Sequence, residues 1–146
     1  MSVQPTETLE KFGYPDTLLS ESQHWVVLLH PKQVTAGCMV LAIKGDIRNM
    51  PDVAPEAYAE LAAVTAGLEG ALKETLNFDK INYLKLMMVD PQVHFHVIPR
   101  YASERTVAGV TFDDPGWPAQ PDMSRAVELS EAQFRALGEA LKRNWP

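Results

Sequence analysis

The sequence has little cysteine and no long apolar segment. Its one cysteine, Cys38, cannot form an internal disulfide, and we expect a small buried thiol there, as is usual in a reducing cytoplasm. The longest apolar runs, residues 25–29 and 38–43, are far shorter than the roughly 18 residues that indicate a membrane span. The N-terminal stretch MSVQPTETLEKFGYP has neither the basic nor the apolar region of a secretion signal. These absences predict a cytoplasmic protein without a membrane partner.

Positive charge is also scarce. The formal net charge at pH 7 is −6, and the sequence has no run of Lys and Arg that would displace counterions from a polyphosphate backbone. We therefore expect no nucleic acid polymer as a partner, whereas a small anion in one local pocket stays open. Neither of the two common Gly-rich phosphate loops occurs, which excludes the dinucleotide-binding and P-loop types of nucleotide site.

The composition supports one ordinary core. With 146 residues and 46% apolar side chains, the chain has room for a single domain, residues 1–146. Residues 23–30 and 37–44 are strongly apolar and predict two strands near the middle of a sheet. A helix is predicted from Pro55 to about Asn77, because mostly apolar side chains recur there at intervals of three and four residues. This stripe consists of Tyr58, Leu61, Thr65, Leu68, Leu72 and Leu76.

A hairpin is predicted after this helix. Residues 80–89 and 92–100 are rich in β-branched and aromatic side chains, and each range predicts a strand. The Asp90-Pro91 pair between them leaves room only for a tight connection. We therefore expect the two strands to be antiparallel neighbours.

The last part of the chain differs in character. Residues 102–129 are rich in turn signals and are predicted to be irregular. Ser130 is predicted to cap a final helix, with Gln133 three residues later as in a capping box. The order of strands, long helix, strands and final helix predicts an α+β domain with a mainly antiparallel sheet.

The stretch QVHFHVIPRY, residues 92–101, holds two of the four histidines of the chain. Successive side chains of a strand point to opposite faces, so Gln92, His94 and His96 share one face while apolar side chains occupy the other. Neighbouring polar side chains on that face lie about 6.5 Å apart. They must be hydrated, hydrogen-bonded or bound to a ligand, which makes this face the strongest candidate for a functional site.

Three interpretations of His94 and His96 stay open on this pattern. The two rings could take part only in a hydrogen-bond network. They could chelate zinc, but a zinc site needs further ligands, and no Cys, Asp or Glu pairing is obvious nearby. They could act in catalysis at phosphorus, because a neutral imidazole, with an ordinary pKa of about 6.5, attacks near pH 7 without prior activation.

Residues 94–100, HFHVIPR, resemble the motif of the histidine triad (HIT) family, in which His alternates with apolar residues and a Pro-Arg pair often follows. A weaker resemblance covers residues 31–44, which look like the family's Pro-rich turn, glycine and apolar strand. The similarity defines a core of about residues 20–101 and leaves 102–146 as a C-terminal extension. It implies a HIT-like version of the α+β fold, with a long central helix and a C-terminal helix, in a homodimer that uses no cofactor.

The resemblance also implies catalytic roles. The middle histidine of the triad falls on His94, which would be the nucleophile, and the third falls on His96, which would contact the phosphate and the leaving oxygen. The first falls on Gln92, where the family has histidine. Glutamine donates and accepts hydrogen bonds, but it cannot carry a proton as an imidazolium does. If that position mainly orients its neighbours, turnover is slowed rather than lost.

Three further residues are candidates for substrate binding. His30 stands where the family usually has an acidic residue that holds the ribose hydroxyls. Asn82 is predicted either to approach the site from the adjacent strand, as a family Asn does, or to be an ordinary polar residue of the hairpin. Arg100 is predicted either to neutralise phosphate or to anchor the strand end through an ion pair. No metal ligand is assigned.

Together these residues predict a nucleotide phosphohydrolase or nucleotidyl transferase. In this hypothesis His94 attacks the α-phosphorus of a nucleotide conjugate or dinucleoside polyphosphate. The alternative is a nucleotide-binding or regulatory protein of the HIT type with weak or no turnover. The third hypothesis is a structural sheet protein with a zinc pair.

Overall fold

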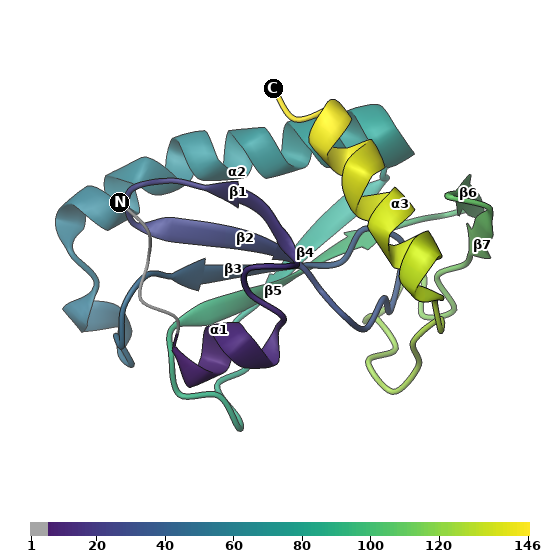
Figure 1. Ribbon diagram of the computed structural model, residues 1–146. Helices are drawn as coiled ribbons and strands as arrows, with labels where there is room; N and C mark the ends of the chain where they lie inside the picture. Colours follow the sequence, from purple (N-terminus) through teal and green to yellow (C-terminus); the bar gives the residue numbers. More distant parts are fainter. Residues whose placement is uncertain (1–5) are drawn as a thin grey trace.

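The computed structural model describes residues 6–146, which contain three α-helices and two β-sheets (Figure 1). The strands are β1 (Leu18–Glu21), β2 (Trp25–Leu29), β3 (Met39–Ile43), β4 (Lys80–Leu84), β5 (His94–Arg100), β6 (Arg105–Val107) and β7 (Val110–Phe112). The helices are α1 (Glu7–Lys11), α2 (Pro55–Leu76) and α3 (Glu131–Arg143), and one 3-10 turn, η1, covers Met50–Asp52. This combination confirms the predicted α+β class.

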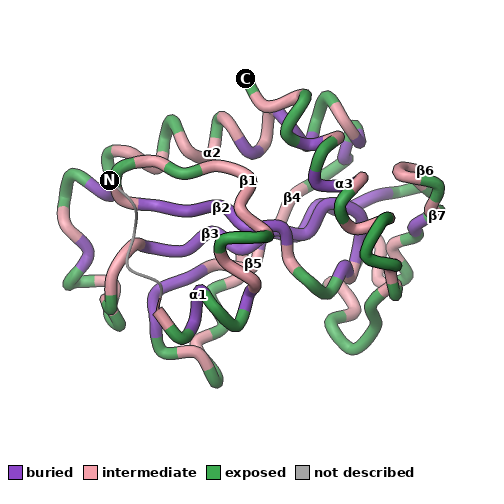
Figure 2. The backbone as a smooth tube through the Cα atoms, in the orientation of Figure 1, coloured by how far each residue is buried: buried purple, intermediate pink, exposed green. Residues whose placement is uncertain are grey.

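Five strands form the main sheet in the order β1-β2-β3-β5-β4, and every neighbouring pair is antiparallel. β2 and β3 are buried along their whole length (Figure 2). They lie within the apolar ranges 23–30 and 37–44, so the predicted central strands are confirmed. The predicted hairpin pairing is confirmed as well, because β4 and β5 are antiparallel neighbours.

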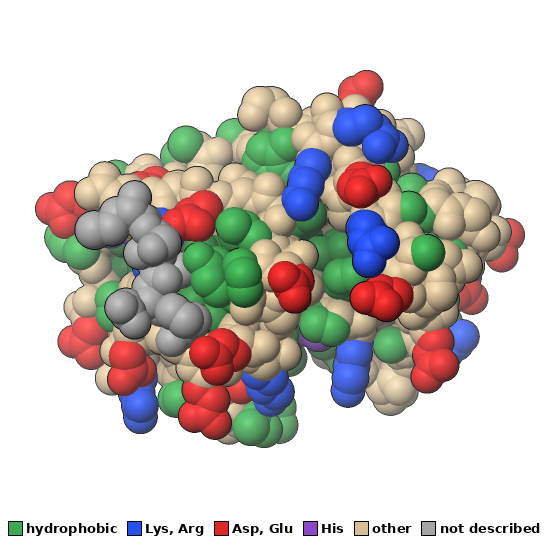
Figure 3. Space-filling view, in the orientation of Figure 1, with side chains coloured by type: hydrophobic (Ala, Val, Ile, Leu, Met, Phe, Trp, Pro, Cys, Tyr) green, Lys and Arg blue, Asp and Glu red, His purple; other side chains and the backbone are tan. Residues whose placement is uncertain are grey.

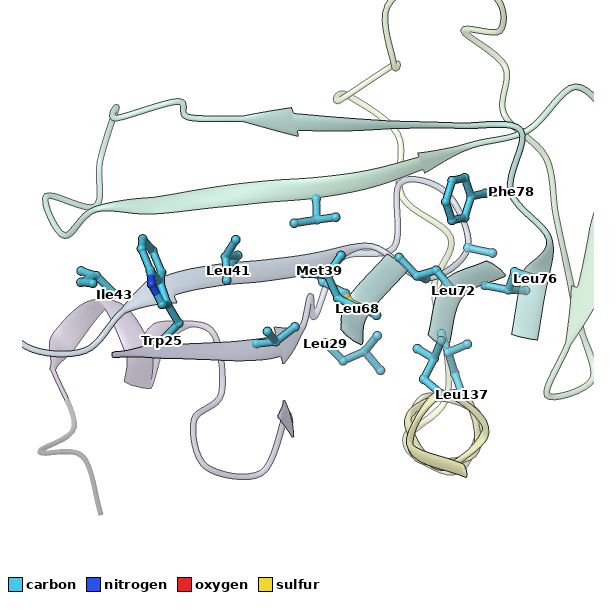
Figure 4. Close-up of a cluster of buried hydrophobic side chains, with 14 of the residues drawn as sticks. Trp25, Leu29, Met39, Leu41, Ile43, Leu68, Leu72, Leu76, Phe78 and Leu137 are labelled. Atoms are coloured by element: carbon cyan, nitrogen blue, oxygen red, sulfur yellow. The ribbon is translucent and has the colours of Figure 1, made fainter. Parts of the chain in front are cut away.

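The main core lies between the sheet and helices α2 and α3. α2 runs along one face of the sheet, and α3 packs against α2 and β1 (Figure 1). Side chains from β2, β3 and both helices meet in this layer (Figure 4), among them Trp25, Leu29, Leu41, Leu68, Leu72 and Leu137. Each is almost fully buried, which contributes about 1.5–3 kcal/mol for a side chain of this size. This layer is what makes the sheet a rigid platform.

A smaller apolar cluster lies on the opposite face of the sheet. Leu9 and Phe12, in and just after α1, pack there against side chains of β2 and β3, namely Val26, Leu28, Val40 and Ala42. α1 has five residues, too few for a stable isolated helix. Its position therefore depends on burying these two side chains.

Local sequence sets the ends of the longer helices. Pro55 occupies the first turn of α2, where a backbone N–H has no helical partner anyway. α2 ends where Asn77 adopts a φ of 49°, a left-handed conformation that Asn tolerates. Ser130 and Gln133 form the predicted capping box of α3, with reciprocal hydrogen bonds of 3.1 and 2.9 Å. Within residues 6–146, no helix combines the length and apolar character needed to cross a membrane.

The structure corrects the boundaries predicted for the hairpin. β4 ends at Leu84 instead of Val89, and residues 85–93 form a loop rather than a tight connection. Met88 and Val89 are 83% and 80% exposed, so their apolar side chains have no layer to pack against. The apolar composition of residues 85–89 predicted a longer strand, but in the structure this segment is not buried and the strand stops before it.

One short helix and three short strands were not predicted. α1 and β1 precede the first expected strand, and β6 and β7 form a hairpin within the range 102–129 that was expected to be irregular. Ala108 and Gly109 close this hairpin with φ values of 55° and 75°. Each of these elements has three to five residues, which is too few to show a periodic pattern.

Candidate functional site

The histidines of β5 lie on the sheet face that α1 covers. His94 and His96 are opposite Ala42 and Val40 of β3. His30 directly follows β2 and reaches the same place. The ring centroids of His94 and His96 are 5.2 Å apart, and those of His96 and His30 are 5.3 Å apart. Three imidazoles from two segments of the chain therefore form one cluster.

Phe12 covers this imidazole cluster. Its ring centroid lies 5.3 Å from that of His30, 5.7 Å from that of His94 and 6.0 Å from that of His96. Phe12 is 6% exposed and His94 is 1% exposed. The His94 ring is therefore almost closed to solvent, with Phe12 packed beside it.

Hydrogen bonding fixes the tautomer of His94. Its Nδ1 lies 2.6 Å from the backbone carbonyl oxygen of Gln92. A carbonyl only accepts hydrogen bonds, so Nδ1 is the protonated nitrogen in the neutral ring, and Nε2 then carries the lone pair. The nitrogen available for nucleophilic attack is thus set by the backbone two residues earlier.

Burial favours the neutral forms of the other two imidazoles. It lowers the pKa of His30 to about 4, with smaller contributions from His96, Lys32 and His94. Burial also lowers the pKa of His96, and His94 adds to this effect. The backbone N–H of Lys32 donates to Nδ1 of His30 at 3.0 Å, so Nε2 of His30 carries the ring proton. At neutral pH, His30 and His96 therefore add N–H donors and lone pairs to the cluster rather than positive charge.

A buried glutamine, Gln33, holds the turn that carries His30. Its Nε2 donates to the carbonyl oxygens of His30 and Cys38 at 2.8 and 2.9 Å. Its Oε1 accepts from the backbone N–H groups of Gly37 and Cys38 at 2.8 and 3.1 Å. All four bonding positions of the amide are used. Cys38 beside it is a buried free thiol, as predicted, and burial raises its pKa.

Gln92 contacts both the sheet and the start of α1. Its side-chain amide donates to the carbonyl oxygen of Ile43 and accepts a hydrogen bond from the hydroxyl of Thr6. Thr6 is the N-cap of α1, where its hydroxyl also accepts from the N–H of Leu9. The Gln92 side chain thus links β3 to α1, while its backbone carbonyl serves His94.

Arg100 and Asn82 lie farther along the hairpin and bond to each other. The Arg100 guanidinium donates to both carboxylate oxygens of Asp114, at 2.7 and 3.2 Å, and to Oδ1 of Asn82 at 3.0 Å. Asp114 also accepts from the N–H of Tyr101 at 3.1 Å. The side chains of Arg100 and Asp114 are only 5% and 0% exposed. Arg100 therefore anchors the strand end through a buried ion pair.

A small hollow opens beside His96. Its volume is about 10 Å³, room for about one water molecule, and its lining includes His30, Lys32, Val34, His96, Ile98 and Met123. Figure 3 shows a small area of histidine surface at the back of a recess. Among residues 6–146, no three His, Cys, Asp or Glu side chains are placed so that they could hold a metal ion.

The comparison with family models decides the family. The HIT domain model matches residues 11–103, which include the imidazole cluster and Phe12. The chain belongs to the HIT domain family. Membership of the HIT family supports a nucleotide-binding protein. The C-terminal segment with Asp114 and α3 lies outside the matched range.

Solved HIT structures share this fold over nearly the whole chain. A histidine triad protein from Sinorhizobium meliloti 1021 has a TM-score of 0.75 at 22% identity, covering 98% of this chain and 97% of its own. One from Marinobacter aquaeolei VT8 has a TM-score of 0.74 at 24% identity, with coverages of 98% and 96%. A hypothetical histidine triad nucleotide-binding protein from Sulfolobus tokodaii strain7 has a TM-score of 0.65 at 17% identity, covering 88% of this chain and 82% of its own. At these identities the likeness concerns the fold alone. The comparison with curated proteins found no match.

The structure thus brings His30, His94 and His96 together and places Asn82 and Arg100 beyond them along the HIT hairpin. Their functional roles stay predictions. Sequence reasoning missed Phe12 and Gln33. Nothing local distinguishes Phe12 from other apolar residues, whereas a polar Gln33 within a turn between two buried strands is a weak signal of a structural amide.

Proposed function

We propose that the protein is a nucleotidyl hydrolase or transferase of the HIT type, in which His94 attacks the α-phosphorus of a nucleotide conjugate. The observation that carries this proposal is the 2.6 Å contact from Nδ1 of His94 to the Gln92 carbonyl, which makes Nε2 the lone-pair nitrogen of the neutral ring. The neighbouring ring of His96, 5.2 Å away between centroids, supports it.

The reaction has two steps at phosphorus. In the first, Nε2 of His94 forms a bond to the α-phosphorus, and the bond from phosphorus to the leaving group breaks. The leaving atom takes the bonding electrons and receives a proton that His96 relays from solvent. In the second, a water oxygen bonds to phosphorus, the bond to Nε2 breaks, and the water gives up one proton. A transferase uses an acceptor hydroxyl in place of this water.

The other site residues have supporting roles in this proposal. The N–H at Nε2 of His30 donates to the phosphate or sugar of the bound nucleotide. Gln92 is a positioning residue, because its carbonyl orients the His94 ring. A neutral cluster holds phosphate through directed N–H groups, and the phosphate charge in turn favours protonation of His96.

Intact-mass analysis of a rapidly quenched reaction tests the nucleophile. With adenosine 5′-phosphoramidate as substrate, we expect the mass to rise by one adenylyl group and the adduct to disappear in His94→Ala. His24→Ala is the matched control, since His24 pairs with Glu60 outside the cluster. Unchanged turnover in His94→Ala would refute the assignment.

The second candidate is a nucleotide-binding or regulatory protein with weak or no turnover. The tight cover over His94, 1% exposed beneath Phe12, favours it. Titration calorimetry with AMP, combined with the quench experiment, separates the two. Binding of AMP without an adduct and without turnover on adenylated and guanylated substrates supports this second candidate, and an adduct together with efficient turnover eliminates it.

A further inference from the structure

The small hollow beside His96 lies where three segments of the chain meet. His96 comes from β5, His30 and Lys32 come from the turn after β2, and Met123 comes from the C-terminal extension. Met123 lies outside the range 11–103 that the HIT domain model matches. One wall of this hollow is therefore specific to the part of the chain for which the sequence predicts no role.

A backbone bridge joins the segment that carries Met123 to the turn that carries Lys32. The N–H of Val127 donates to the carbonyl oxygen of Gln33 at 2.9 Å, and the two residues form an isolated antiparallel bridge. The Gln33 side chain in turn binds four backbone groups of the same turn. The two walls of the hollow are therefore attached to each other, and the side chains of Lys32 and Met123 border one common space.

His30 and Lys32 present hydrogen-bond donors to the hollow. Nδ1 of His30 accepts from the backbone N–H of Lys32 at 3.0 Å, so Nε2 carries the ring proton. The Lys32 ammonium has three donors and no acceptor. Its charge helps to lower the pKa of His30, as expected for a cation near that ring. None of the described residues that line the hollow is an Asp or Glu.

The positive charge of Lys32 is available to a ligand. Lys32 is exposed and forms no ion pair with a described residue. Asp122, the acidic neighbour of Met123, accepts hydrogen bonds from the N–H and the hydroxyl of Ser124 within its own turn. An ammonium beside a ring N–H attracts an acceptor with negative charge.

This set of donors suits a phosphorylated sugar better than a free one. A sugar hydroxyl donates as well as accepts, and a carboxylate is the usual acceptor for it in a nucleotide site. Where the sugar carries a phosphate, a basic side chain takes the place of that carboxylate, because the phosphate oxygens only accept. The hollow combines a cation and a ring N–H, with no carboxylate among its described lining residues.

We propose that this hollow receives a phosphate carried by the sugar of the nucleotide, at its 2′ or 3′ oxygen. The inference rests on the proposed function, in which His94 binds the α-phosphorus. The ring of His96 lies between those of His94 and His30, with centroid distances of 5.2 and 5.3 Å. A sugar bonded to the α-phosphate through its 5′ oxygen therefore extends toward His30 and Lys32.

Met123 is the part of the hollow that adapts to this ligand. The hollow has a volume of about 10 Å³, which is less than a phosphate group occupies. Met123 is 42% exposed, and a methionine side chain has three rotatable bonds. In the proposed complex it turns outward and widens the space between Lys32 and His30. The substrate class is then a nucleoside bisphosphate or a 5′ conjugate of one.

Titration calorimetry with AMP, ADP, adenosine 2′,5′-bisphosphate and adenosine 3′,5′-bisphosphate tests the proposal. We expect the parent protein to bind at least one bisphosphate about tenfold more tightly than AMP, and the preferred isomer shows which oxygen carries the phosphate. Lys32→Gln should remove this difference. It should change the affinities for AMP and ADP, whose phosphates are all at the 5′ end, by less than about twofold. Equal affinities of the parent for AMP and both bisphosphates would disprove the proposal.

Two lysine variants serve as controls. Lys142→Gln removes the same charge from an exposed position of α3 and should leave all four affinities unchanged. Lys32→Arg keeps the charge and should retain the preference for the bisphosphate. If Lys142→Gln abolishes the preference as Lys32→Gln does, the effect comes from overall charge and the proposal is wrong.

His30→Asp tests the other donor of the hollow. This variant replaces the ring N–H with a carboxylate, which accepts from sugar hydroxyls and repels a sugar phosphate. We expect it to bind AMP more tightly than either bisphosphate, which reverses the order found in the parent. An unchanged order in a folded variant would overturn the proposal, and the exposed Lys32 variants carry the test if His30→Asp does not fold.

The quenched reaction separates this inference from the proposed function. A preference for a bisphosphate without an adenylyl adduct refutes only the hydrolase or transferase activity. An adduct together with equal affinities for AMP and both bisphosphates refutes only the sugar-phosphate site.

Discussion

At the scale of single residues, Gln92 serves the site through two separate groups. Its backbone carbonyl fixes the His94 tautomer, and its side-chain amide joins Ile43 of β3 to Thr6 at the start of α1. A side-chain substitution therefore leaves the first function in place and removes the second. Glutamine at this position is better explained by anchoring than by proton transfer.

Gln92→Ala is expected to loosen α1 while the adenylyl-histidine adduct still forms. Loss of the buried amide leaves the Ile43 carbonyl without its partner, which costs about 1–3 kcal/mol of the free energy of unfolding. Hydrogen exchange should show faster exchange of the α1 amides, and the quench experiment should still show the adduct. Thr6→Val is the comparison variant, because it removes the Thr6 hydroxyl from both Gln92 and the Leu9 N–H while the bond from Gln92 to the Ile43 carbonyl stays in place. Loss of the adduct with α1 exchange unchanged would contradict this division of roles.

How far the sequence predicts the site depends on the range of each contact. His94, His96 and Gln92 share a strand face because of the two-residue period, so local reasoning brings them together. Phe12 contacts the cluster only after α1 folds over the sheet. It lies more than eighty positions before His94 and His96 in the sequence. No local pattern predicts a contact of that kind.

At the scale of elements, the Arg100–Asp114 pair joins the end of β5 to the C-terminal extension. The pair is almost fully buried and is bidentate, with further bonds to Asn82 and the Tyr101 N–H. Strands β2 and β3 and helices α2 and α3 could be predicted because their periodicity or capping signals are local. The Asp114 connection could not, because a turn sequence does not show which buried cation it will meet.

Asp114→Asn is expected to destabilise the protein by about 3–5 kcal/mol, because it leaves the buried Arg100 charge without its counterion. Urea denaturation followed by circular dichroism measures this change. The double variant Arg100→Met, Asp114→Leu should recover part of the loss, since it removes both charges. Asp46→Asn is the control, because its pair with Arg48 is exposed and should leave the urea midpoint unchanged. If Asp114→Asn changes the urea midpoint as little as Asp46→Asn does, the Arg100–Asp114 pair does not hold the C-terminal extension in place.

At the scale of the whole molecule, the imidazole cluster links stability to pH. The folded pKa of His30 is about 4 and that of His96 is also lowered, both mainly by burial, whereas an unfolded histidine has a pKa of about 6.5. Between these values the unfolded chain binds more protons than the folded one. The stabilisation is complete above pH 6.5 and is lost as the pH falls toward 4.

His30→Gln is expected to make the unfolding free energy less dependent on pH in this window. Urea midpoints of parent and variant, measured from pH 7.5 to 4, should converge as the pH falls, because the variant no longer excludes a proton at position 30. Carboxylate titrations affect both proteins alike and cancel in the difference. Parallel curves would show that His30 does not take part in this linkage.

The saturated amide of Gln33 has a consequence for directed evolution. Because this one side chain supplies four hydrogen bonds of the turn, the adjacent side chains of Lys32 and Val34 are free of that task, yet both border the hollow beside His96. A library randomised at these two positions reshapes the rim of the site while the turn keeps its conformation. The lining of the hollow can therefore be varied within a segment whose conformation one neighbouring side chain maintains.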